Sequence, residues 1–229
     1  MLYLILVLLK CISICHLQDA SQFITVDPNT QMLVDESGRE VFFHGVNVVS
    51  KQPPYHPKVT GFGPYTFSEI DLKLLRELGL NTIRLGMMMP GYVPKRGVYN
   101  ETYLAVIEHI VSTAAKYGIY TLLDMHQDVL SRKICGEGLP DWIINTKGAR
   151  PFPYPLTDVQ NAFKINPVTG YPYTEDCSRF EWTDYYFTDA TAKAFQNLYD
   201  NVDGLRDAWG EFWKKTATAF RKDKLRVST

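Results

Sequence analysis

Residues 119–128 read Ile-Tyr-Thr-Leu-Leu-Asp-Met-His-Gln-Asp. Their apolar part is typical of a strand buried on both faces of a parallel sheet. Two comparable runs precede it, at 40–49 and 82–87. Amphipathic helical patterns separate the three runs, at 67–78 and 100–116. This alternation predicts an α/β fold with a parallel sheet of three strand–helix units.

Short motifs mark the ends of the predicted elements. Thr66-Phe67-Ser68-Glu69 fits a capping box for the first helix, and Asn100 is a natural N-cap for the second. Ahead of the first long strand, 23–26 and 32–34 predict a small hairpin. The expected apolar stripe of the first helix consists of Ile70, Leu74, Leu75 and Leu78.

The composition bounds the class of protein. The 229 residues are 45% apolar, with 24 Lys and Arg against 25 Asp and Glu, a net charge of -1. A chain of this kind can bury a core, which excludes a disordered protein. Its near-neutral net charge gives no excess of positive charge for binding nucleic acid. The length falls just short of the about 250 residues that a complete (β/α)8 barrel usually needs.

The N-terminus resembles an export signal. Its apolar run is shorter than the about 20 residues that span a bilayer, so we interpret residues 1–18 as a signal peptide, with a buried N-terminal strand as the alternative. No later segment approaches transmembrane length. The remaining chain, 19–229, is therefore expected to be secreted, or lumenal in the secretory or lysosomal pathway.

Two cysteines, Cys135 and Cys177, lie outside the predicted leader. An oxidising compartment favours a bridge between them, which would close a loop of about 40 residues and contribute on the order of 4 kcal/mol. Two free buried thiols are the alternative. Asn100-Glu101-Thr102 is a glycosylation sequon, so Asn100 is a candidate attachment site as well as a helix cap.

A long connection runs from residue 127 to 188 and is rich in proline and aromatic residues. Disordered segments are poor in aromatics, which favours a folded excursion over the sheet, pinned by Cys135 and Cys177, above a disordered linker. Helical patterns resume at 189–201 and 204–222. No fourth apolar strand follows them.

Polar groups follow the strands at the carboxyl end of the predicted sheet, where parallel α/β folds place their reactive groups. If the chain is still extended here, the two-residue period of a strand puts Asp124, His126 and Asp128 on one face. They could contact substrate, form a structural hydrogen-bonded histidine, or hold a divalent metal. Arg84 lies within a predicted buried strand and needs a carboxylate partner, so a structural ion pair is its alternative role. No cofactor motif is present, and no cofactor is expected.

Four segments together resemble the endoglycoceramidases, secreted members of glycoside hydrolase family 5: 44–51, 81–87, 124–131 and 136–142. The resemblance implies a (β/α)8 barrel of which this chain holds about the first three strand–helix units. It also implies retaining hydrolysis of the bond between glycan and ceramide. The implied partner is a glycosphingolipid at a membrane or micelle surface.

The resemblance also implies roles for single residues. Arg84 matches an arginine that keeps the nucleophilic carboxylate ionised, and we identify no counter-ion for it in this sequence. His126 matches a histidine that lines the sugar subsite beside the scissile bond. Lys51 and Asp128 match glycan-contacting groups, and Trp142 is the expected platform for stacking on a sugar.

The family's two catalytic glutamates have no counterpart here. One lies in an Asn-Glu-Pro motif after the fourth strand and the other ends the seventh, and the sequence contains neither. Asp128 and Glu137 lie on one loop and are not expected to replace them. We therefore expect 19–229 to be an inactive N-terminal portion of the catalytic domain, truncated before the fourth strand. The alternatives are a glycolipid-binding module and a small α/β domain with a metal at His126.

Overall fold

The computed structural model describes residues 23–221, so the predicted signal peptide at 1–18 lies outside the described residues. Its centre is a parallel sheet in the order β3 (Gly45–Val48), β4 (Thr82–Gly86) and β5 (Tyr120–Asp124). The register places Asn47 beside Arg84 and Arg84 beside Leu122. The predicted α/β fold with three parallel strands is confirmed.

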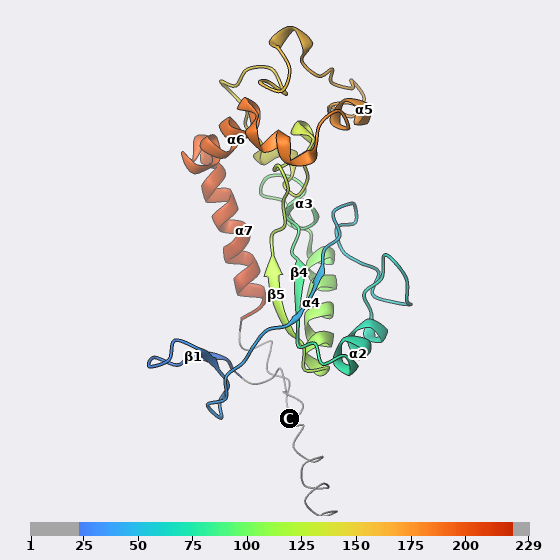
Figure 1. Cartoon of the computed structure of the whole chain (residues 1–229), viewed down its shortest axis with the longest axis vertical. Helices are drawn as coiled ribbons and strands as arrows, with labels where there is room; N and C mark the ends of the chain where they lie inside the picture. Colours follow the sequence, from blue (N-terminus) through green and yellow to red (C-terminus); the bar gives the residue numbers. More distant parts are fainter. Residues whose placement is uncertain (1–22, 222–229) are drawn as a thin grey trace, which may run out of the picture.

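Helices flank this sheet, and a long segment lies beyond its end. Figure 1 shows α7 on one side of the strands, α2 on the other and the connection after β5 above the tip of the β5 arrow. The predicted hairpin is confirmed as the antiparallel pair β1 and β2. The elements not yet bounded are β1 (Thr25–Val26), β2 (Leu33–Val34), α2 (Glu69–Glu77), α3 (Met89–Tyr92), α4 (Glu101–Lys116), α5 (Thr174–Cys177), α6 (Asp189–Tyr199) and α7 (Leu205–Ala219). Within residues 23–221 we find no helix whose length and apolar character would suit a membrane span.

The two outer strands differ from the prediction of strands buried on both faces. Ile83 and Leu85 of the central strand β4 are fully buried, whereas Val46 of β3 is 39% exposed and Leu122 of β5 is 61% exposed. Within the described residues, β3 and β5 each pair only with β4. The first strand is also shorter than predicted, because β3 begins only at Gly45 and the exposed Phe42 and Phe43 lie ahead of it.

The N-cap of helix α2 lies two residues after the one that the predicted capping box implies. Ser68, rather than Thr66, is the N-cap, and the Ser68 backbone N–H donates the reciprocal hydrogen bond to the Asp71 carboxylate. Its buried residues are Leu72 and Leu75, so only part of the expected stripe faces the core. The exposed members of that stripe are Ile70, Leu74 and Leu78.

The connection between β5 and α6 is folded, as expected. Its centre is an aromatic cluster in which Phe163 contacts Phe152, Phe180 and Tyr185 at centroid distances of 5.6 to 6.3 Å. The predicted Cys135–Cys177 disulfide is present and joins the two ends of this segment. Packing of these four rings, of which Phe163 and Tyr185 are buried, offsets the entropy lost in ordering a long loop. The connection, residues 127–188, is hereafter called the excursion.

Candidate functional site

Arg84 and Asp124 form an ion pair at the carboxyl end of the sheet. They lie on the neighbouring strands β4 and β5, and Arg84 Nη2 is 2.8 Å from Asp124 Oδ2. The Arg84 side chain is 38% exposed, so the expectation of a buried guanidinium was wrong. Asp124 is also the counter-ion that sequence reasoning did not identify, and it favours the structural role considered for Arg84.

His126 links this ion pair to a second carboxylate. Its Nδ1 is 3.1 Å from Asp124 Oδ2 and 3.3 Å from Arg84 Nη1, while its Nε2 is 3.2 Å from Asp128 Oδ2. Asp124, His126 and Asp128 therefore lie together, as predicted, although β5 itself ends at Asp124. Contacts at both ring nitrogens fix the orientation of the imidazole.

Lys51 joins the same network from the segment that follows β3. Its Nζ is 2.7 Å from Asp128 Oδ2 and 2.5 Å from Glu137 Oε1. One ammonium thus holds two carboxylates from the two ends of the turn after β5. All three side chains are between one quarter and two fifths exposed, so the groups remain accessible to a polar ligand.

The backbone of this turn explains how Asp128 and Glu137 come together. Asp128 N donates to Glu137 O at 2.9 Å, and Glu137 N donates to Asp128 O at 2.6 Å. Gly136 allows this close approach, because a Cβ there would lie 2.1 Å from the carbonyl oxygen of Val129. Only glycine fits at that position.

The pKa values follow from these contacts. Burial by itself raises the pKa of Asp128, but the hydrogen bond from Lys51 and its positive charge, with a further contribution from His126, bring it below its ordinary value. Burial lowers the pKa of Lys51, and the hydrogen bonds and charges of Asp128 and Glu137 bring it above its ordinary value. Asp128 is therefore a carboxylate and Lys51 an ammonium at neutral pH.

A cavity of about 310 Å³ opens beside this network. Lys51, Asp128 and Glu137 line it together with Cys135 and Trp182. The Trp182 side chain is 54% exposed, which leaves an aromatic surface free beside charged hydrogen-bonding groups. This combination suits a polar ligand that also carries apolar C–H surface.

Trp142 does not line this cavity, and its expected role as a stacking platform stays a prediction. Its indole N–H donates to Val93 O at 2.9 Å, and its ring packs partly buried against the core. Trp142 therefore anchors the start of the excursion to the segment after α3. Trp182, from a different part of the excursion, lines the cavity instead.

Sequence reasoning missed Glu137 and Trp182 as members of the site. Glu137 lies within the quoted segment 136–142, so its place in that motif was an available signal. No sequence signal marked Trp182 as a member of the site, because it lies 54 positions after Asp128 on an irregular segment. In residues 23–221 no group of three or more His, Cys, Asp or Glu side chains is placed to hold a metal ion.

Comparison with known proteins identifies the family. The model of the cellulase family (glycosyl hydrolase family 5) matches residues 34–228. An endoglycoceramidase of Hydra vulgaris is 64% identical over 204 residues, and one of Cyanea nozakii is 63% identical over 206 residues. These alignments cover 89% and 90% of this chain but 39% and 40% of the two relatives, so the chain spans about two fifths of their length.

A solved structure shows the same relation. Endoglycoceramidase II from Rhodococcus sp., in its ganglioside GM3 complex, has a TM-score of 0.61 at 24% identity. The match covers 85% of this chain and 40% of that chain, which shows the fold to be a partial (β/α)8 barrel. The chain therefore belongs to glycosyl hydrolase family 5, within which it is similar to the endoglycoceramidases.

Proposed function

We propose that this chain carries the glycan-recognition part of an endoglycoceramidase-type glycosidase acting on glycosphingolipids. The observation that carries the proposal is the cavity in which Lys51, Asp128 and Glu137 face solvent beside Trp182. Sugars present hydroxyl groups around the ring and C–H groups on its faces. Lys51 would donate to hydroxyls, the two carboxylates would accept from them, and Trp182 would pack on a ring face.

His126 and Arg84 are proposed to border the same subsite. The network from Arg84 through Asp124 and His126 to Asp128 fixes these groups before any ligand arrives. A preorganised site loses less entropy on binding than one whose side chains must first be ordered. These contacts support roles in holding a sugar.

Hydrolysis is proposed to require carboxyl groups other than these. A retaining glycosidase needs an acid and a nucleophile about 5–5.5 Å apart on either side of the bond that breaks. Asp128 and Glu137 instead bind one ammonium, and the pKa of Asp128 is lowered, whereas a general acid needs a raised one. We propose that the 229-residue chain binds glycan without cleaving it.

The proposed setting is an oxidising compartment and a lipid surface. The Cys135–Cys177 bridge supports export, because disulfides persist outside the cytosol. The glycolipid headgroup would then approach the cavity from a membrane or micelle, as expected from the resemblance.

A titration with lactose and with the GM3 oligosaccharide tests binding. We expect saturable binding of at least one glycan, and a loss of about tenfold in affinity, or about 1.4 kcal/mol, for both Lys51→Met and Trp182→Ala. Lys73→Met, on the exposed face of α2, is the matched control and should bind like the unchanged chain. No binding of either glycan by the folded chain would contradict the recognition role.

A hydrolysis assay tests the second part of the proposal. The chain is incubated with a glycosphingolipid labelled by a fluorophore on its ceramide, and release of labelled ceramide is measured. We expect no release above a protein-free control. Turnover that disappears in Glu137→Gln would show that the cluster after β5 is catalytic after all.

A further inference from the structure

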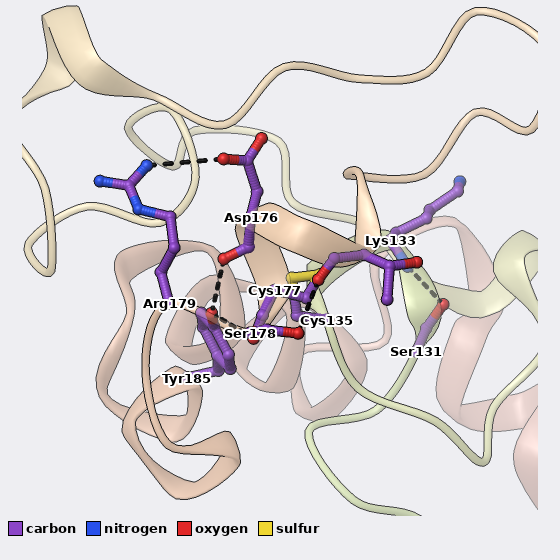
Figure 2. Close-up of a disulfide and its surroundings, with 9 residues drawn as sticks. Ser131, Lys133, Cys135, Asp176, Cys177, Ser178, Arg179 and Tyr185 are labelled. Atoms are coloured by element: carbon purple, nitrogen blue, oxygen red, sulfur yellow. Dashed lines mark hydrogen bonds and ion pairs between the residues drawn. A yellow bond between two sulfur atoms is a disulfide. The ribbon is translucent and has the colours of Figure 1, made fainter.

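The Cys135–Cys177 disulfide joins two segments of the chain that both contribute residues to the lining of the cavity. Cys135 itself lines the cavity, two residues before Glu137, and Cys177 precedes Trp182 by five residues in the sequence. The bridge, drawn in Figure 2, therefore joins Cys135, on the segment that carries Glu137, to Cys177, on the segment that carries Trp182.

Backbone hydrogen bonds connect the segment around Cys135 to the charged network. Gly136 N donates to Ser131 O at 2.9 Å, and Glu137 exchanges two backbone hydrogen bonds with Asp128. No flexible linker separates the cysteine from Glu137. The segment around Cys135 keeps its shape through its own backbone hydrogen bonds.

On the other segment, Tyr185 connects Cys177 to the short helix that contains Trp182. The buried Tyr185 hydroxyl donates to Cys177 O at 2.9 Å, a contact drawn in Figure 2. Trp182 and Tyr185 belong to one short 3-10 helix, Trp182–Phe187. The aromatic cluster around Tyr185 consists of excursion residues, and the disulfide is what ties this helix covalently to the Glu137 turn.

Small thiols can reach the bridge. Both cysteines are partly exposed, and Cys135 faces the open cavity. Two equivalents of a small thiol supply two electrons and two protons, the S–S bond breaks, both cysteines become thiols, and the reductant leaves as its own disulfide.

We infer that the Cys135–Cys177 bridge is a redox-sensitive positioning element of the glycan cavity. In the oxidised state it holds Trp182 on the cavity that Lys51 and Glu137 also line. After reduction, the 177–187 segment separates from the Glu137 turn while the three-stranded sheet and α4 keep their structure. The effect on glycan binding rests on the function proposed above, whereas the effect on segment 177–187 does not.

Hydrogen exchange of the whole chain, with and without dithiothreitol, tests the structural part. We expect amides of 177–187 to exchange at least tenfold faster after reduction, and amides of α4 to exchange at an unchanged rate. The variant Cys135→Ser with Cys177→Ser should show the fast rate in both conditions, which controls for effects of the reductant on Cys11 and Cys15. Unchanged exchange in 177–187, or equal acceleration in α4, would overturn the inference.

Lactose titration in both redox states tests the functional part. We expect reduction to weaken binding about tenfold in the unchanged chain and to have no effect on the double serine variant. Equal affinity in both states would overturn the positioning role. Absence of lactose binding in both states would count against the proposed function, and hydrogen exchange alone would then decide the inference.

Discussion

At the scale of single residues, the Lys51 ammonium is the group on which the candidate site depends. Asp128 and Glu137 both contact it within 2.7 Å, and Asp128 in turn contacts His126. Two carboxylates held this close repel each other unless a cation lies between them. Lys51 thus has a structural role as well as its proposed role in glycan binding.

Lys51→Met therefore tests the electrostatics of the cluster. Lys51 is 39% exposed, so solvent screens the pair and we expect a loss of about 1 kcal/mol or less in the free energy of unfolding at pH 7. The pKa of Asp128 lies below its ordinary 3.8, so its stabilising effect is present above about pH 4 and is lost as the pH falls through the lowered value.

The raised pKa of Lys51 acts at the other end of the pH range. Its stabilising effect is complete below the ordinary 10.5 and disappears as the pH rises through the higher, folded-state value. Urea unfolding is measured at pH 3, 5, 7 and 9 for the unchanged chain and for Lys51→Met. The difference in the free energy of unfolding between these two proteins should be constant from pH 5 to 9 and smaller at pH 3. A difference that grows at pH 3 would contradict this assignment.

At the scale of elements, α4 begins at a residue with two predicted roles. The Asn100 side chain accepts a hydrogen bond from Tyr103 N at 3.1 Å, which confirms the N-cap. Asn100 is also exposed, as a glycosylation acceptor must be. Glycosylation of Asn100 stays a prediction.

Two substitutions separate the cap from the sequon. Asn100→Ala removes both and should lower the free energy of unfolding by about 1 kcal/mol, whereas Thr102→Ala removes the sequon alone and should change it by less than about 0.5 kcal/mol. Both should abolish the mass shift seen on enzymatic deglycosylation of protein secreted from a eukaryotic host. If the unchanged protein shows no such shift, Asn100 is a cap only.

At the scale of the whole molecule, the described sheet has two open edges. Leu122 on β5 and Val46 on β3 are exposed there, and a groove of about 810 Å³ runs between β3 and α2. Unpaired strand edges beside apolar surface favour association with other chains. The 229-residue chain should therefore self-associate in solution.

The substitution Leu122→Thr tests this expected self-association, and the same change at the adjacent Leu123 is its control. Because Leu122 is 61% exposed, its replacement should reduce self-association in concentration-dependent light scattering while the free energy of unfolding stays unchanged. Leu123→Thr alters the adjacent residue, which packs against the core, and should cost about 2 kcal/mol in stability. Equal scattering by the Leu122 variant and the unchanged chain would rule out β5 as the associating edge.

The sequence by itself determined the local elements and much of the cluster. Alternating apolar runs and helical stripes predicted β3, β4, β5, α2 and α4, because burial patterns repeat with the period of each element. The two-residue period also placed Asp124, His126 and Asp128 together. Counting the cysteines outside the predicted leader correctly paired Cys135 with Cys177.

The tertiary structure alone decided which distant groups meet. Asp124 became the partner of Arg84 because the parallel register sets β4 beside β5. Trp182 came to line the cavity because the excursion folds around its own aromatic cluster. The path of an irregular segment has no sequence period from which to predict it. Exposure of β3 and β5 likewise depends on which strands lie beside them, a property of the assembled sheet rather than of either strand's residues.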